Sequence, residues 1–351
     1  MIQGANELLA RIRAIHESIR DSVVASCEQQ AIEQLSTIVG EQAGDTIFAL
    51  DHVSEEVLVE HFTALGRERS FVLIAEGLDE DGIRTFPAGT DPDEAELRII
   101  IDPIDGTRGV VYQKRAAWIL TGVAPNQGAQ TSLKDIEIAV QTEIPLIKQH
   151  LSDCFWSIAG QGVDGERVNF RTGERQPLKP QPSRASTIAS GFGAISRFFP
   201  GGRAELAAID DTVVERILGP VKPGQAQTFE DQYLSSGGQL YELLMGHDRW
   251  IADLRPLIDA QARRHGKAFG LNCHPYDLCT ELIGREAGLI ITDEYGNQQA
   301  APLDVTSGIS WVGYANEQIY QQVAPMLRDV LRERGLLENA TNLNKDAERT
   351  S

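Results

Sequence analysis

Two short apolar runs that each end in an acidic residue are the feature that most constrains how this chain folds. Residues 71–75 (Phe-Val-Leu-Ile-Ala) precede Glu76, and residues 97–101 (Leu-Arg-Ile-Ile-Ile) precede Asp102. Apolar runs of this length and composition predict buried strands. If these strands are neighbours in one sheet, Glu76 and Asp102 leave it at the same edge, and the sequence therefore predicts a cluster of carboxylates there.

The second acidic residue opens a turn with its own chemistry, Asp102-Pro103-Ile104-Asp105-Gly106-Thr107. Proline has no backbone N–H and restricts the residue before it, so we expect the strand to leave the sheet at this point. Two carboxylates three residues apart in a tight turn can face one point, which is unfavourable unless a cation lies between them. Gly106 allows backbone N–H groups to approach a ligand, and Thr107 adds a hydroxyl. The turn therefore predicts metal ligands on one side and phosphate-binding amides on the other.

The rest of the chain predicts an α/β protein in two halves. A long amphipathic helix is expected at 5–38 and a second helix at 51–65. Strands are expected at 117–124, 135–142 and 154–158, and Ile136, Ile138 and Val140 alternate with polar residues as in a half-buried strand. A polar, turn-rich stretch at 160–184 predicts a hairpin and a linker.

We place the domain boundary near Arg184. Residues 1–184 then form an α+β half and residues 185–337 an α/β half, followed by a polar tail at 338–351. The second half predicts a strand at 185–192, and a loop-rich excursion at 197–228 around a helix at 203–217. Helices and strands then alternate. We expect helices at 238–246, 256–265, 276–287 and 317–334, and strands at 249–253, 288–292 and 309–313.

Charge and composition exclude several classes of partner. The chain has 351 residues, enough for one large domain or two modest ones, and a net charge of −19, which disfavours binding to nucleic acid or an anionic membrane surface. The four cysteines fit no zinc pattern. Neither a signal peptide nor a membrane-spanning run is expected, so we predict a cytoplasmic protein.

The motifs together resemble the inositol monophosphatase-like superfamily, which includes fructose-1,6-bisphosphatases and bisphosphate nucleotidases. The resemblance rests on the Asp-Pro-Ile-Asp-Gly-Thr run, the upstream strand ending in Glu76, and the downstream run His274-Pro275-Tyr276-Asp277-Leu278 before Glu286-Ala287-Gly288. The family usually has tryptophan where this chain has Tyr276. The resemblance extends to about residue 330 but leaves 197–228 without an obvious counterpart. It implies a layered αβαβα fold with the site between the halves, and a homodimer.

The resemblance also implies roles for individual residues. Glu76, Asp102 and the carbonyl of Ile104 would bind one Mg²⁺, and Asp102, Asp105 and Asp277 a second, with two or three ions in the site. Gly106 and Thr107 would donate backbone N–H groups to the substrate phosphate. Asp51 would pair with Thr107 to orient the attacking water, with Glu76 also in the catalytic set. Ser236 and Gly237 would line the substrate pocket.

Several of these residues also have ordinary explanations. Asp277 and Asp51 are each well placed to cap a helix, and capping does not exclude metal binding. Glu76 is one of several acidic residues near the end of its strand, and His274 is more typical of a packed or solvent-facing side chain than of a base.

The function implied is Mg²⁺-dependent hydrolysis of a small phosphate monoester, such as a sugar or polyol phosphate, by a metal-activated water. Inositol monophosphatases carry a glutamate seven residues before the second-motif aspartate, where this chain has Gly270, so inositol phosphate is disfavoured. One alternative is a bisphosphate phosphatase, for fructose 1,6-bisphosphate or a 3′-phosphoadenosine nucleotide, with Arg197, Arg203 and Lys222 meeting the second phosphate. Another is a non-catalytic phosphate-binding regulator on the same fold. Sensitivity to lithium is a further expectation.

Overall fold

The computed structural model of the chain describes residues 1–30, 32–42, 45–79, 82–267 and 270–338. Within these ranges the side chains of residues 32–33, 38–42, 45–49 and 51–56 are not described. The side chain of Asp51 and nearly all of the tail predicted at 338–351 therefore lie outside the described residues.

A mixed eight-stranded sheet forms the first half of the protein, in the order β10-β9-β8-β7-β6-β5-β3-β4. Its strands are β3 (Phe71–Ala75), β4 (Ile83–Phe86), β5 (Leu97–Asp105), β6 (Ala117–Pro125), β7 (Ile138–Ile144), β8 (Leu151–Ile158), β9 (Val163–Asn169) and β10 (Glu174–Pro177). Strands β3 and β5 are parallel neighbours, which is an arrangement that brings Glu76 and Asp102 to the same edge. Every other pair in this sheet is antiparallel. The sheet therefore brings the ends of β3 and β5 to one edge.

Helices α1 (Ala5–Gln29) and α3 (Ala49–Leu65) cover one face of this sheet. The helix expected at 5–38 is shorter than predicted, because the regular spacing of buried side chains ends at Cys27. A short α2 (Ile32–Leu35) and the hairpin strands β1 (Ile38–Gln42) and β2 (Asp45–Phe48) follow instead. Two more short helices, α4 (Thr107–Val111) and the 3₁₀ helix η1 (Leu133–Asp135), lie in connections between strands.

The second half has a four-stranded sheet in the order β11-β12-β14-β13, and helices on both of its faces. Its strands are β11 (Phe192–Ile195), β12 (Asp248–Asp253), β13 (Ile290–Thr292) and β14 (Trp311–Tyr314). Its helices are α5 (Arg203–Leu218), α6 (Ser236–Leu244), α7 (Arg255–Arg263), α8 (Pro275–Leu278), α9 (Glu281–Glu286) and α10 (Glu317–Glu333). The boundary expected near Arg184 lies in the connection between the last strand of the large sheet and the first of the small one.

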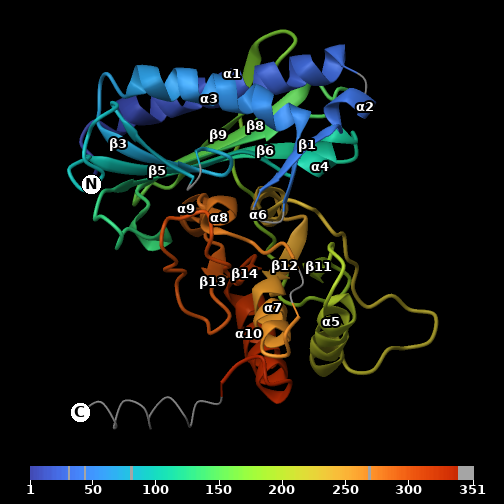
Figure 1. The fold of residues 1–351 in the computed structure, drawn as a ribbon. Coiled ribbons are helices and arrows are strands. Elements are labelled where there is room, and N and C mark those ends of the chain that lie inside the picture. The colour runs from blue at the N-terminus through green and yellow to red at the C-terminus, as the bar shows by residue number, and fades with distance from the viewer. Residues whose placement is uncertain (31, 43–44, 80–81, 268–269, 339–351) are drawn as a thin grey trace, which may run out of the picture.

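These elements stack in five layers (Figure 1). Helices α1 and α3 lie on the large sheet, helices α6, α8 and α9 lie between the two sheets, and α5, α7 and α10 cover the far side of the small sheet. Three hydrophobic cores fill the spaces between the layers. The layered αβαβα fold implied by the sequence is therefore confirmed.

Two predicted elements of the second half are wrong. Residues 185–191 form no strand, because side chains bind their carbonyls: Arg249 Nη1 donates to Thr187 O at 2.6 Å, and Asn316 Nδ2 to Ala185 O at 3.0 Å. The helix expected at 276–287 is divided into α8 and α9 by a turn at Cys279-Thr280.

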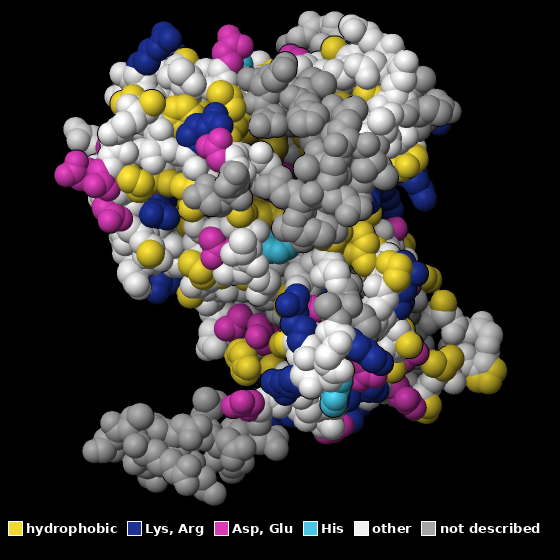
Figure 2. Space-filling view, in the orientation of Figure 1, with side chains coloured by type: hydrophobic (Ala, Val, Ile, Leu, Met, Phe, Trp, Pro, Cys, Tyr) yellow, Lys and Arg dark blue, Asp and Glu magenta, His cyan; other side chains and the backbone are white. Residues whose placement is uncertain are grey.

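Acidic and basic side chains are interspersed on the face of the protein drawn in Figure 2, over the described residues of both halves. Among the described residues, exposed ion pairs such as Arg11 with Glu68 and Arg175 with Glu17 contribute little to stability individually. In the described part of the chain, no helix combines the length and the apolar character that crossing a membrane requires.

A buried histidine joins α1 to the large sheet. His16 is fully buried, with Nδ1 2.9 Å from Thr142 Oγ1 on β7 and Nε2 2.8 Å from Thr121 Oγ1 on β6. Burial, with a smaller contribution from the charge of Arg20, lowers the pKa of His16 from 6.5 to about 3. The imidazole is therefore neutral in the folded protein at pH values where it is protonated in the unfolded chain.

We predict that His16 weakens the fold as the pH falls below 6.5. The unfolded chain takes up this proton first, so the free energy of unfolding decreases by up to about 1.4 kcal/mol per pH unit between 6.5 and 3 from this group alone. Urea unfolding at several pH values should show a shallower acid limb for His16→Gln than for the wild type. Equal slopes for the two proteins would contradict the assignment.

Candidate metal centre

The site begins with an irregularity in strand β5. We expected the chain to leave the sheet at Asp102-Pro103, but β5 continues to Asp105. Asp102 pairs with Leu120 of β6, and Asp105 pairs with Trp118. An advance of three residues along β5 therefore corresponds to only two residues along β6. This is a β-bulge, one of the few places where a sheet accepts a proline, and a bulge re-aims the side chains beside it.

The bulge and helix α8 bring three carboxylates together. One ligand oxygen from each of Asp102, Asp105 and Asp277 lies within 4.8 Å of the others, and this is the group of possible metal ligands among the described residues. Asp102 and Asp105 are each 6% exposed. Burial, and then the charges of Asp105, Asp277 and Glu76, raise the pKa of Asp102 well above its usual value. Burial and the charge of Asp277 raise the pKa of Asp105 to about 7.

The first turn of α6 holds Asp105 in place. Asp105 Oδ2 accepts hydrogen bonds from Ser235 Oγ at 2.8 Å and from the Gly237 N–H at 2.6 Å. The Ser235 hydroxyl also caps α6 by accepting from the Gly238 N–H. A Cβ on Gly237 would lie 2.6 Å from a methyl group of Leu120 and 3.0 Å from Asp105 Oδ2, so only glycine allows this approach.

The two residues expected to line the substrate pocket, Ser236 and Gly237, lie at the start of α6. The Gly237 N–H donates to Asp105 Oδ2. Ser236 is buried, and its hydroxyl lies 3.7 Å from the sulfur of Cys273. The start of α6 thus positions a carboxylate, and binding of substrate by Ser236 or Gly237 stays a prediction.

Asp277 is fixed by the start of its own helix. Its Oδ2 accepts the His274 N–H at 2.6 Å, in a capping box in which Asp277 is the third helical residue rather than the N-cap. The ring of His274 stacks on Tyr276 and its Nδ1 lies 3.8 Å from Asp277 Oδ2. Burial alone would lower the pKa of His274, but its hydrogen bond and charge interaction with Asp277 raise it overall.

The remaining motif residues close the turn after the bulge. The Ile104 N–H donates to Asp102 Oδ1 at 3.0 Å, and Thr107 Oγ1 donates to the Ile104 carbonyl at 2.8 Å. Gly106 has a φ of 92° and directly precedes α4, and a Cβ there would lie 3.0 Å from Cβ of Ser235. The Asp-Pro-Ile-Asp-Gly-Thr segment therefore folds tightly against the start of α6.

Glu76 lies near this cluster without being one of the three grouped ligands. It is half-buried at the end of β3, and its charge raises the pKa of both Asp102 and His274. Its metal binding stays a prediction. Asp51 falls within α3, but its side chain lies outside the described residues, so its pairing with Thr107 stays a prediction too.

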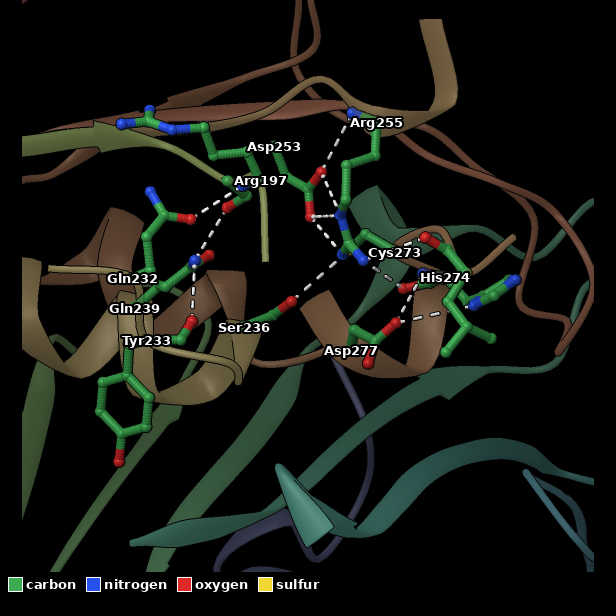
Figure 3. A network of polar contacts seen from close by, with 12 residues as sticks. Arg197, Gln232, Tyr233, Ser236, Gln239, Asp253, Arg255, Cys273, His274 and Asp277 are labelled. Carbon is green, nitrogen blue, oxygen red and sulfur yellow. Dashed lines mark hydrogen bonds and ion pairs between the residues drawn. The ribbon is translucent and has the colours of Figure 1, made fainter. Parts of the chain in front are cut away.

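A second acidic residue near Asp277 was missed by the sequence analysis. Asp253 ends β12 fully buried, and Arg255 Nε binds its Oδ1 at 2.9 Å. Figure 3 shows this pair beside Cys273 and Asp277, and the charges of Asp253 and Asp277 both act on the pKa of Cys273. Helix α7 lies between Asp253 and the second motif, so Asp253 is not one of the residues just before Asp277. The sequence feature that could have indicated this residue is that the strand expected at 249–253 ends in an aspartate, Asp253.

The basic residues proposed for a second phosphate are engaged within the protein. Arg197 forms ion pairs with Asp210 and Glu230, and Arg203 Nε donates to the carbonyls of Arg197 and Phe199. The contacts of Arg197 and Arg203 hold the loop that precedes α5. The ring of Phe199 in this loop lies 5.4 Å from the guanidinium carbons of both Arg108 and Arg255. The third residue, Lys222, is exposed on the connection that runs out beside α5 (Figure 1).

The donor set fits a hard divalent cation. All three grouped side chains are carboxylates, the ligands that Mg²⁺ and Ca²⁺ prefer. Two of them are buried with raised pKa values, so the cluster is strained at neutral pH unless a positive charge enters it.

We predict opposite effects of Asp102→Asn with and without metal. Because the pKa of Asp102 is raised in the folded protein, its ionisation makes the protein less stable as the pH rises above the ordinary carboxyl range. In EDTA at pH 8 the variant should therefore be more stable than the wild type. It should also lose the rise in unfolding temperature that Mg²⁺ gives the wild type. As a control, Asp153→Asn removes a buried carboxylate bound by Arg167 and Tyr241, and should destabilise the protein in both conditions. A destabilised, Mg²⁺-responsive Asp102→Asn would contradict the metal assignment.

Comparison with known proteins identifies the fold. No family model matches the chain, and no curated protein does. Solved structures do match, each at 14% sequence identity. Fructose-1,6-bisphosphatase from Leishmania major has a TM-score of 0.68, covering 94% of this chain and 96% of its own. The extragenic suppressor protein SuhB from Bartonella henselae has a TM-score of 0.62, covering 92% and 98%. A hypothetical protein from Pyrococcus horikoshii with similarities to inositol-1 monophosphatase has a TM-score of 0.60, covering 92% and 99%.

These similarities extend over nearly the whole length of every chain compared, and they include proteins of the superfamily that the sequence motifs resemble. The resemblance is thus confirmed at the level of the fold. This chain has the fold shared by fructose-1,6-bisphosphatase, SuhB and inositol monophosphatase-like proteins.

Proposed function

We propose that this protein is a Mg²⁺-dependent phosphatase that hydrolyses a small phosphate monoester. The observation that carries the proposal is the group formed by Asp102 and Asp105, buried at the bulge of β5, and the half-buried Asp277 of α8. All the ligand atoms of this group are oxygens, which Mg²⁺ prefers. The group lies beside the Gly106-Thr107 turn, where a phosphate would bind next to the metal. The phosphatases of the same fold support the reaction class by analogy.

Asp102, Asp105 and Asp277 would hold Mg²⁺, with Glu76 and the Ile104 carbonyl as further ligands. When bound, the metal neutralises phosphate charge, lowers the pKa of water and stabilises the leaving oxygen. The protein's own part is to hold the carboxylates in position. Ser235 and the Gly237 amide fix the direction of Asp105, and the His274 amide fixes that of Asp277. Each of these donors orients its carboxylate, and the hydrogen bonds from Ser235 and Gly237 partly counter the rise in the pKa of Asp105.

Gly106 and Thr107 would bind the substrate phosphate through the backbone. The first N–H groups of a helix have no acceptor within that helix, and α4 begins at Thr107. The Thr107 hydroxyl donates to the Ile104 carbonyl, which ties this turn to Asp102. We propose that Asp51 and Thr107 together orient the attacking water.

A substrate with a single phosphate is favoured over a bisphosphate. The bisphosphate alternative named Arg197, Arg203 and Lys222. The two arginines are bound to carboxylates or backbone carbonyls of the protein, and Lys222 is exposed.

The test is phosphate release from a panel of sugar, polyol, inositol and nucleotide phosphates, including fructose 1,6-bisphosphate, with and without Mg²⁺. We predict Mg²⁺-dependent release from a sugar or polyol monophosphate, and a fall in kcat/KM of more than about a hundredfold in Asp105→Asn. Asp304→Asn is a matched control, because Asp304 binds only its own turn at Thr306 and Ser307 among the contacts described. Release from bisphosphates alone would favour the alternative, and no release by folded, Mg²⁺-binding protein would favour a non-catalytic regulator.

A further inference from the structure

One buried side chain of the large sheet contacts both segments of the second half that build the metal centre. Gln141 on β7 is fully buried. Its Nε2 donates to the carbonyl of Gly237 at 2.8 Å, and its Oε1 accepts from Thr280 Oγ1 at 3.0 Å. Both ends of the amide are therefore satisfied by residues that lie more than ninety positions away along the chain.

The strand register explains how Gln141 reaches the site. Asp102 pairs with Leu120 across β5 and β6, and Leu120 pairs with Gln141 across β6 and β7. Residues directly opposite each other in antiparallel strands project from the same face. Gln141 thus lies in the same row as Asp102, two strands away. Leu120, between them, fills the space under Gly237.

Each residue that Gln141 contacts belongs to a segment that holds or carries one carboxylate of the cluster. Gly237, which accepts from Gln141 through its carbonyl, donates its N–H to Asp105 Oδ2 at 2.6 Å. Thr280, which donates to Gln141, follows Asp277 by three residues and lies at the corner between α8 and α9. Gln141 therefore joins the segment that holds Asp105 to the segment that carries Asp277.

We propose that Gln141 is a positioning residue that sets the spacing of Asp105 and Asp277, and through it the affinity of the site for Mg²⁺. The inference rests on the proposed function, because it assigns Mg²⁺ to the cluster. Removing the amide leaves the Gly237 carbonyl and the Thr280 hydroxyl buried without this partner. The first turn of α6 and the α8–α9 corner are then free to shift independently on the sheet. Partners of metal ligands typically contribute about 10- to 100-fold to metal affinity.

The experiment is Mg²⁺ binding by calorimetry on the purified full chain, with no substrate, for the wild type, Gln141→Met and Thr280→Val. Methionine matches glutamine in length and removes both hydrogen bonds. Valine matches threonine in shape and removes only the hydrogen bond between Thr280 and Gln141. Tyr241→Phe is the control. Its hydroxyl also ties α6 to the sheet, by donating to Asp153 Oδ2 at 2.7 Å, but from the part of the helix away from Asp105.

We expect Gln141→Met to weaken Mg²⁺ binding about tenfold or more, Thr280→Val to weaken it in the same direction, and Tyr241→Phe to leave it within twofold. Thermal unfolding in EDTA measures how far each change lowers the stability of the metal-free protein. If Gln141→Met does not fold, Thr280→Val alone tests the inference. Unchanged Mg²⁺ affinity in folded Gln141→Met or Thr280→Val overturns the inference, as does equal weakening in Tyr241→Phe.

Failure of the proposed function gives a different result. A wild type that binds Mg²⁺ with the predicted variant pattern, yet releases no phosphate, contradicts the phosphatase proposal and supports the role of Gln141. A wild type that binds no Mg²⁺ overturns both.

Discussion

Repulsion between buried carboxylates is the constraint on which the rest of this structure depends. One ligand oxygen from each of Asp102, Asp105 and Asp277 lies within 4.8 Å of the others, and burial makes the charges of Asp102 and Asp105 costly. Backbone and hydroxyl donors direct each carboxylate, from the bulge itself, from the start of α6 and from the start of α8. Those donors offset part of the repulsion, and a divalent cation would offset the rest.

The cluster exists only because the second half packs on the large sheet. Asp102 and Asp105 belong to β5, whereas Asp277 and the donors to Asp105 come from the helices between the sheets. Polar contacts fix this packing at several points: Gln141 with Gly237, Tyr241 with Asp153, and Glu286 with the amides of Gly160 and Gly162. Hydrogen bonds of this kind specify one arrangement of two surfaces more narrowly than apolar contact does.

The layered fold was implied by the resemblance to a known superfamily, whereas local patterns in the sequence predicted the strands at 71–75 and 97–101. They failed where distant segments decide the local structure. The strand at 138–144 alternates apolar and polar residues, which is typical of a half-buried strand, yet Gln141 is fully buried because the second half covers its face. Arg197 and Arg203, which one alternative placed at a second phosphate, bind carboxylates and carbonyls brought to them by the fold. The bulge at Pro103 depends on pairing with β6, which a motif alone does not reveal.

The most direct test of this account is a crystal structure of the protein soaked in Mn²⁺, a common substitute for Mg²⁺ with a strong anomalous signal. We predict an anomalous peak coordinated by oxygens of Asp102, Asp105 and Asp277, which Asp105→Asn removes or displaces. A structure at neutral pH with no peak among these three carboxylates, with the fold intact and Mn²⁺ in excess, would contradict the central claim that they form a metal centre.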